Sequence, residues 1–271
     1  MDTSPANERI SQEVMALLGT GRQVETFSGR LPDFSLAQAY EVVARVCSLR
    51  RARGETPIGR KIGFTNRSLW GDLGIAAPVW NYVFDRTVRY ALNGAAEVSI
   101  AGMPEPRIEP ELVLHLGAAP APGLSLEELM DCIDWVAPGF EVVFSIFPDW
   151  AFSAADAAAA YGVHGALVVG DRLDVRAAHA SELSTFTVAL EDEAGLRRDG
   201  HASNVLGGPV HALKFLVDEI ARYPGCEPLK ADEIITTGTL TEAMPLRPNQ
   251  AWRAEFQGIA LNPLRLRIGP N

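Results

Sequence analysis

The N-terminal part of the chain places apolar residues at the spacing of amphipathic helices. Within residues 10–18 the apolar positions recur every three or four residues, so they share one helix face. Residues 35–54 begin with Ser35 and Gln38 in the positions of a capping box and end with a basic turn followed by glycine. Both stretches predict helices, which together form a helical segment over residues 1–57.

From about residue 58 the pattern changes to short apolar runs that Gly and Pro interrupt. The runs are rich in Val, Ile, Phe and Thr and are separated by turn residues, as strands are. Helical spacing returns twice, in residues 125–137 and 209–223. The predicted strands are residues 57–64, 110–117, 139–147, 165–170, 186–195, 232–240 and 252–268.

The order of these elements indicates the fold class. The strands follow one another mostly as hairpins rather than alternating with helices, which favours an α+β fold with a curled, largely antiparallel sheet. No internal repeat and no long linker divides the chain. Residues 58–271 are therefore predicted to form one structural unit, on which the helical segment 1–57 packs.

The charge balance narrows the possible partners. The 271 residues include 24 Lys and Arg against 34 Asp and Glu, which gives a net charge of −10. A surface this acidic argues against nucleic acid and against an anionic membrane as the main partner. An anionic substrate would need a local cation to overcome this charge.

Cysteine usage and the N-terminus indicate the compartment. The three cysteines form no CxxC pair, which fits a reducing compartment and gives neither a disulfide framework nor a zinc site. The N-terminus lacks the apolar core of a signal peptide, and no apolar run reaches membrane-spanning length. We therefore expect a soluble cytoplasmic protein. The cysteines are Cys47, Cys132 and Cys226.

Two carboxylates stand at the head of an apolar strand, in residues 107–116. Alternation along a strand puts Glu109 and Glu111 on the same face, opposite an apolar stripe. Neighbours on that face are roughly 7 Å apart at Cα, so both carboxylates can reach a common point. The alternative is that this face is simply solvated, as in many antiparallel sheets.

A third acid, Glu141, lies inside an apolar run that is predicted to be buried on both faces. An ionised carboxylate in such surroundings must be paired, protonated or bound to a metal, and no Lys or Arg occurs between residues 135 and 147. An ion pair with a distant Arg is one solution. The other is an oxygen cage for Mg²⁺ or Mn²⁺ built from Glu141 with Glu109 and Glu111.

Lys61 lies in a short strand between glycines, close to the apolar residues Ile62 and Phe64. Most lysines are solvated, which is the alternative here. A partly desolvated lysine would have a lowered pKa and would suit proton transfer. Lys61 is therefore a candidate catalytic residue.

A turn follows the apolar strand at residues 232–240. Its Gly-Thr-Leu-Thr sequence offers the backbone N–H groups from Gly238 onward and the hydroxyls of Thr239 and Thr241 to an anion. Such a turn is more often only a turn, so this signal is weak by itself.

Taken together and in order, these motifs resemble the 2-oxopent-4-enoate hydratase and 4-oxalocrotonate decarboxylase group of the fumarylacetoacetate hydrolase superfamily. The resemblance covers nearly the whole chain. It implies the curled mixed β-sheet of that superfamily, a barrel-like roll, preceded by the N-terminal helical segment. The matching stretches are residues 35–43, 59–75, 107–116, 139–150, 201–220, 229–250 and 254–268.

The resemblance also implies roles for individual residues. Glu109, Glu111 and Glu141 would hold a divalent cation, Mg²⁺ or Mn²⁺. This cation would chelate the 1-carboxylate and 2-oxo oxygens of a short 2-oxo or 2-hydroxy dienoic acid and act as a Lewis acid. Lys61 would be the proton shuttle.

Three further positions follow from the same resemblance. Thr239 or Thr241 would hold a substrate carboxylate oxygen in the turn that begins at Gly238. Asp85 matches an acidic position that lines the pocket of the family, although a turn residue after a strand is an equally good interpretation.

The chain departs from the family at several positions. The Asp-Ser-Arg run that usually follows the third Glu is replaced by Phe144, Ser145 and Ile146. Tyr161 and His164 stand where smaller polar groups are expected. His164 is either a buried structural imidazole or a pocket acid/base that titrates near neutral pH.

These observations favour a metal-dependent lyase that adds water across a conjugated 2-oxo-alkenoate in the lower pathway of aromatic-ring degradation. Decarboxylation of a 2-oxo-dioic acid such as 4-oxalocrotonate is the first alternative. The second is hydrolysis of a C–C bond in an acylpyruvate, with His164 as the base. A non-catalytic partner subunit is a further one. The resemblance implies a homo-oligomer, which could form a complex with a related pathway enzyme.

Overall fold

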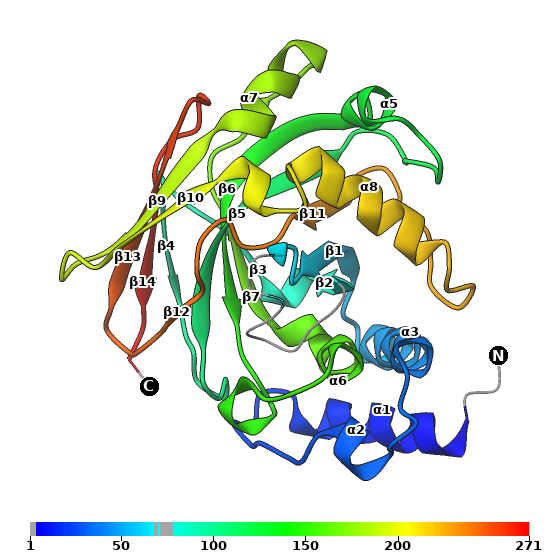
Figure 1. Ribbon diagram of the computed structural model, residues 1–271. Coiled ribbons are helices and arrows are strands. Elements are labelled where there is room, and N and C mark those ends of the chain that lie inside the picture. Colours follow the sequence, from blue (N-terminus) through cyan, green and yellow to red (C-terminus); the bar gives the residue numbers. More distant parts are fainter. Residues whose placement is uncertain (1–3, 68–69, 71–77, 271) are drawn as a thin grey trace.

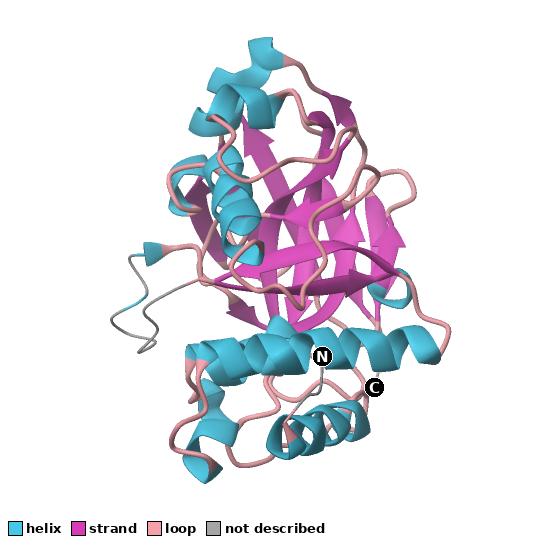
Figure 2. Cartoon of the chain, turned by 90° about the vertical axis from the view of Figure 1, so that its right-hand side faces the viewer, coloured by secondary structure: helices cyan, strands magenta, loops and turns pink. Residues whose placement is uncertain are grey.

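The computed structural model describes residues 4–67, 70 and 78–270, so part of the 59–75 motif lies outside it. The helices of this part of the chain lie at both ends of the strands and along one side between those ends (Figures 1 and 2). The α-helices are α1 Pro5–Leu17, α2 Phe27–Arg30, α3 Leu36–Ala52, α5 Leu126–Met130, α6 Ala154–Ala159, α7 Ala180–Thr185 and α8 Pro209–Ile220.

The N-terminal helices form as the pattern predicts. The capping box at the start of α3 is present, because the Ser35 side chain accepts from Gln38 N and the Gln38 side chain accepts from Ser35 N. Helix α1 begins at Pro5, earlier than predicted, where the Ser4 hydroxyl accepts from the backbone of Asn7. Helix α3 packs against α1 and also against α6.

The strands of the described residues form two sheets. The larger sheet has the order β2-β1-β11-β5-β6-β7-β3, with β12 added on β5 and β8 on β6, and the smaller has the order β10-β9-β13-β14-β4. The strands are β1 Pro57–Gly63, β2 Val79–Phe84, β3 Val88–Tyr90, β4 Ala95–Val98, β5 Arg107–Leu116, β6 Ile133–Val143, β7 His164–Val169, β8 Leu173–Asp174, β9 Thr187–Asp192, β10 Arg197–His201, β11 Ile234–Thr236, β12 Met244–Pro245, β13 Ala251–Gln257 and β14 Leu264–Ile268.

The larger sheet is mixed and curled, which confirms the predicted fold class. Most neighbouring strands are antiparallel, but β1 pairs with β11 and β3 pairs with β7 in parallel. The longest ladder joins β5 to β6 over almost their whole lengths, from Arg107 opposite Val143 to Leu116 opposite Ile133. This ladder carries all of the acidic residues singled out for metal binding.

The predicted helix over residues 125–137 is wrong beyond residue 130. Helix α5 ends at Met130, and the chain enters strand β6 at Ile133. The apolar residues of this stretch fit a helix face and a buried strand equally well, and pairing with β5 decides in favour of the strand. Three short helices of the described residues, α2, α6 and α7, were not predicted.

The strands around the site carry a buried cluster on each face. The larger cluster joins one face of the larger sheet to α3, α6 and α8. The smaller cluster includes Val113, Trp135 and Leu167, and strand alternation puts Val113 on the same face of β5 as Glu109 and Glu111. No helix in the described residues is long and apolar enough to cross a membrane.

Candidate active site

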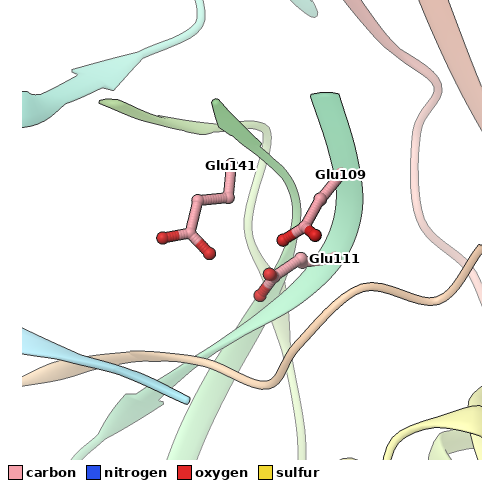
Figure 3. Close-up of side chains that lie close together, drawn as sticks. All are labelled: Glu109, Glu111 and Glu141. Carbon is pink, nitrogen blue, oxygen red and sulfur yellow. The ribbon is translucent and has the colours of Figure 1, made fainter. Parts of the chain in front are cut away.

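The three carboxylates predicted to bind a metal come together. Glu109 and Glu111 lie in β5, and Glu141 lies in β6 directly opposite Glu109. One carboxylate oxygen from each lies within 4.8 Å of the other two. Figure 3 shows the three side chains pointing toward a shared space between the strands. Glu111 and Glu141 are completely buried, so this face is not solvated.

Glu111 is held by the turn after β11. Its Oε2 accepts a hydrogen bond of 2.9 Å from the backbone N–H of Gly238, whereas its Oε1 is buried with no hydrogen-bond partner in the described structure. Gly238 has φ of 96°, and a Cβ there would lie 2.0 Å from Thr65 Oγ1. The turn therefore needs glycine, and its N–H positions a carboxylate of the protein.

Glu141 lies between two basic side chains. Lys61 Nζ is 3.2 Å from Glu141 Oε2, and His164 Nδ1 is 2.7 Å from Glu141 Oε1. The buried acid is therefore paired, and its cation is Lys61 rather than a distant arginine. Lys61 also donates a hydrogen bond of 2.9 Å to the carbonyl oxygen of Gly162.

The carbonyl that Lys61 contacts belongs to a strained turn. Tyr161, Gly162 and Val163 all have φ of 60°, and this left-handed conformation is very unfavourable for a β-branched residue such as Val163. Strain of this kind costs on the order of 1–3 kcal/mol per residue and is concentrated at functional sites. Tyr161 itself points away from the carboxylates, because its hydroxyl donates to the carbonyl of Val14 in α1.

When all three carboxylates are ionised, their negative charge exceeds the positive charge that the neighbouring side chains supply. Burial raises the pKa of Glu109 to about 7 and raises the pKa of Glu111 well above its ordinary value. Burial also acts to raise the pKa of Glu141, but the charge of Lys61 and the hydrogen bond from His164 outweigh it and hold the pKa at about 2. Ionising all three requires additional positive charge.

A divalent cation fits this site. The donor set consists only of carboxylate oxygens, which Mg²⁺ and Mn²⁺ prefer. Glu111 Oε1 is a buried acceptor without a hydrogen-bond donor in the described residues, as expected of a metal ligand. We therefore assign Glu109, Glu111 and Glu141 as the residues that could hold the ion.

The pKa of Lys61 shifts in the direction opposite to our expectation. Burial alone acts to lower it, but the negative charges of Glu141, Glu109 and Glu111 outweigh burial and raise it. The sequence could not show that three carboxylates face this amine. These charges favour the ammonium form of Lys61.

A cavity of about 230 Å³ opens above this group. Lys61, Glu109 and Thr239 lie in its wall. The Thr239 hydroxyl donates to the carbonyl of Thr241 at 2.9 Å. Thr241 is buried and does not line the cavity, and its own hydroxyl donates to the backbone of Glu242. Of the two threonines, Thr239 alone is placed to meet a ligand.

His164 lies behind Glu141 and not in this cavity. His164 Nε2 lies 2.8 Å from the Thr87 hydroxyl oxygen, which also lies 2.9 Å from Phe84 O. Both ring nitrogens are thus engaged, one with Thr87 and one with Glu141. The ring instead borders a second cavity of about 410 Å³ on the other side.

Asp85 does not join the carboxylates either. Its side chain is exposed and accepts hydrogen bonds from the backbone N–H groups of Thr56 at 3.0 Å and Arg86 at 2.9 Å. These contacts match the alternative interpretation, in which Asp85 is a turn residue after β2. It does not line the cavity that contains Lys61.

Among the residues of the cavity wall that were not predicted from the sequence, Arg107 and Trp150 contact each other. Arg107 and Trp150 both line the cavity, with the guanidinium carbon of Arg107 4.4 Å from the centre of the Trp150 ring. The signal for Arg107 was available, because it precedes Glu109 by two positions and therefore shares its strand face. The position of Trp150 depends on tertiary packing.

The chain is similar to known proteins in both sequence and structure. Residues 75–265 match the family model described as fumarylacetoacetate (FAA) hydrolase C-terminal. The 2-hydroxyhexa-2,4-dienoate hydratase of Comamonas testosteroni is 26% identical over 253 residues, which cover 93% of this chain and 94% of that protein. A 4-oxalocrotonate decarboxylase from Pseudomonas sp is also 26% identical, with the same coverage.

Solved structures show the same fold. The 4-oxalocrotonate decarboxylase from Pseudomonas putida G7, complexed with magnesium and adipate, has a TM-score of 0.88 at 22% identity, covering 99% of each chain. The fumarylpyruvate hydrolase from Pseudomonas aeruginosa, in complex with Mn²⁺ and pyruvate, has a TM-score of 0.60 at 13% identity, covering 78% of this chain and 89% of that one. The predicted curled sheet with added helices is confirmed.

Proposed function

The chain belongs to the fumarylacetoacetate hydrolase family, and we propose that it is a metal-dependent lyase that adds water to a short 2-hydroxy-dienoic or 2-oxo-alkenoic acid. The observation that carries this proposal is the contact of Lys61 with a cluster of three carboxylates at one cavity. Relatives named as hydratases support the choice of hydration.

The carboxylates would hold the divalent cation. We propose Mg²⁺ or Mn²⁺, which the oxygen-only donor set of Glu109, Glu111 and Glu141 favours and which two structures of similar fold contain. When bound, the ion would supply Lewis-acid charge to the 1-carboxylate and 2-oxo oxygens of the substrate. Gly238 would keep Glu111 oriented through its backbone N–H.

Lys61 would move the proton. Its ammonium, fixed by Glu141 and by the carbonyl of Gly162, lines the cavity in which the substrate would lie. It would give a proton to the dienol carbon chain and be reprotonated by the attacking water, so that the elements of one water molecule are added across the double bond. Thr239 would contact a substrate carboxylate oxygen from the opposite side of the cavity wall.

Decarboxylation of a 2-oxo-dioic acid is the second candidate. The observation that favours it is that no histidine lies among the described residues lining the cavity, since His164 is turned to the other side of Glu141. Decarboxylation needs the same metal and the same proton donor, but no activated water. The relatives named 4-oxalocrotonate decarboxylase support it equally in sequence identity.

Two other interpretations lose their support. Hydrolysis of a C–C bond depended on His164 as a water-activating base, and both ring nitrogens of His164 are engaged by Glu141 and Thr87. A non-catalytic partner subunit would have no need to keep the buried Lys61–Glu141 pair beside two further carboxylates, which is a costly arrangement.

Assembly and location complete the proposal. We propose a cytoplasmic homo-oligomer that can also associate with a related enzyme of the same pathway, as the family resemblance implies. Light scattering on the purified protein would then give a mass that is a multiple of 29.3 kDa.

The reaction is tested by offering the protein two substrates with and without metal. 2-Hydroxypenta-2,4-dienoate would be followed by loss of its dienol absorbance, and 4-oxalocrotonate by release of CO₂. We expect turnover that stops after dialysis against a chelator and returns with Mg²⁺ or Mn²⁺. Turnover that survives complete removal of divalent ions would disprove the metal-dependent mechanism, and CO₂ release without hydration would select the second candidate.

A further inference from the structure

Arg107 is placed at the outer end of the line of metal-binding carboxylates. It begins β5, and strand alternation puts it on the face that carries Glu109 and Glu111. Its side chain lines the same cavity as Lys61 and Glu109. The positive charge of Arg107 acts to lower the pKa of Glu109, against the stronger effect of burial, so the two groups lie near each other.

The guanidinium of Arg107 rests on an aromatic ring rather than on an acid. Its central carbon lies 4.4 Å from the centre of the Trp150 ring. Within the described residues Arg107 forms no ion pair and no side-chain hydrogen bond. The other acid of the cavity rim, Glu242, is engaged by Arg198 at 3.0 Å. The donors of Arg107 are therefore available to a ligand.

Trp150 is held in place by a strained and cross-linked segment. Asp149 and Trp150 have φ of 58° and 56°, and Glu105 has φ of 47°, all in the left-handed region that these residues rarely adopt. Trp150 Nε1 donates to Glu105 O at 3.1 Å, and Asp149 N donates to Glu105 Oε1 at 3.0 Å. Gln23 donates to the same Oε1 at 2.6 Å. A platform fixed in this way keeps the guanidinium oriented.

We propose that Arg107 on Trp150 binds a second carboxylate, at the end of the substrate opposite its 2-oxo acid group. The substrate class is then a 2-oxo or 2-hydroxy-dienoic dicarboxylate rather than a monocarboxylate. This inference rests on the proposed function, because it takes the 2-oxo acid end to be bound at Glu109, Glu111 and Glu141. It holds for hydration and for decarboxylation alike.

The dimensions agree with such a ligand. Successive residues on one strand face are roughly 7 Å apart, which separates Arg107 from Glu109. The five C–C bonds of a six-carbon chain, each about 1.5 Å long, span roughly 6 Å in a zigzag. A guanidinium offers two parallel N–H donors to a carboxylate, and this pairing is among the stronger hydrogen-bonded contacts in proteins.

A pair of saturated ligands tests the inference directly, because neither has the double bond that hydration needs or the conjugation that links a distal carboxylate to the 2-oxo group for loss of CO₂. 2-Oxoadipate and 2-oxohexanoate share the 2-oxo acid group and the chain length and differ in the distal carboxylate. Calorimetry on the Mg²⁺-loaded protein should show that 2-oxoadipate binds about 10- to 100-fold more tightly. In Arg107→Gln this preference should disappear, while the affinity for 2-oxohexanoate stays the same. Arg107→Lys should retain part of the preference.

The control is Arg267→Gln, which removes an exposed arginine of β14 that lies in the smaller sheet. It should keep the wild-type preference. Equal binding of the two ligands by the wild type would overturn the inference and leave the proposed function standing. An equal loss for both ligands in Arg107→Gln would also overturn it, because Arg107 would then serve only to balance the carboxylates. Failure of the metal-loaded wild type to bind either ligand would overturn the proposed function as well.

Discussion

Two neighbouring cations of β1, Arg60 and Lys61, are both buried, yet they face opposite sides of the sheet and have different surroundings. Arg60 stacks over the Tyr82 ring at 3.8 Å, pairs with Glu233 at 3.2 Å, and donates to the carbonyl oxygen of Glu227 at 3.2 Å. Lys61 faces a group of three carboxylates and pairs with one of them.

The difference lies in the balance of charge. On the Arg60 side one cation meets one acid, and the remaining contacts are a ring and backbone carbonyls. On the Lys61 side, Lys61 and a hydrogen-bonded His164 meet three carboxylates, two of which have raised pKa values because they are buried. A balanced buried pair is typical of structure, whereas an unbalanced one calls for a ligand that brings positive charge.

The largest effect is expected from removing charge on the unbalanced side. Glu109→Gln and Glu141→Gln each take away one anionic ligand, so both variants should lose divalent binding and activity completely. Their folds should persist, because the amides keep the size of the side chains. Calorimetry with Mg²⁺ measures this, and an unchanged affinity in both variants would refute the metal assignment.

Removing Lys61, the cation beside the three carboxylates, should lower turnover without preventing ligand binding. Lys61→Ala leaves the three carboxylates in place, so the protein should still bind oxalate in the presence of Mg²⁺. Its turnover should fall by about 10²- to 10⁴-fold, as is usual for a missing general acid. A variant that keeps more than roughly a tenth of the wild-type rate would exclude Lys61 as the proton shuttle.

The acidic half of this site could be predicted because each signal is local. Alternation alone puts Glu109 and Glu111 on one face, and an acid inside an apolar run, such as Glu141, requires a partner. The register that sets Glu109 opposite Glu141 is not local, since it depends on which strands pair. The error over residues 131–137 has the same cause, because pairing with β5 makes that stretch a strand.

His164 could not be placed from the sequence because of a bulge. Val142 of β6 pairs with Ala166, but Val143 pairs with His164, so Gly165 is left over. The extra residue turns His164 onto the face of Glu141, which regular alternation would not allow. A Cβ at Gly165 would lie 2.9 Å from Val142 O, so the bulge requires glycine. A strand pattern cannot reveal where such a residue is inserted.

On the side of the sheet with Arg60, breaking the ion pair between Arg60 and Glu233 should lower the stability of the fold rather than the rate of the reaction. Arg60→Met leaves Glu233 buried without its cation, which typically costs about 3–5 kcal/mol in the free energy of unfolding. Urea unfolding would measure this, with the double variant Arg60→Met/Glu233→Gln as the control. The double variant should recover part of the loss. A single variant as stable as the wild type would show that the pair does not stabilise the fold.

His164 is expected to act on metal affinity through Glu141. In His164→Gln the hydrogen bond from Nδ1 to Glu141 is altered and the contact with Thr87 is lost, so Glu141 is less well oriented. Partners of metal ligands typically contribute about 10- to 100-fold to affinity. A Mg²⁺ titration of His164→Gln measures this, and Thr87→Val, which removes only the outer contact, should have a smaller effect. Equal affinities in all three proteins would show that the ring only fills space.

The smallest effect is expected at the edge of the balanced side, where Glu227 joins α3 to the segment before β11. Its hydrogen bonds with Arg51, and then with Lys230, lower its pKa from 4.5 to about 2. A lowered pKa means that the pair stabilises the fold above pH 4.5 and that this stabilisation is lost as the pH falls from 4.5 toward 2.

The side chains of Arg51 and Glu227 are both more than a third exposed, so Glu227→Gln should lower the free energy of unfolding by less than about 1 kcal/mol at pH 7. Melting temperatures of wild type and variant at pH 7, 5 and 3.5 should therefore converge as the pH falls, and also on adding salt at pH 7. A difference that stays constant with pH would mean that Glu227 acts by packing and not by its charge.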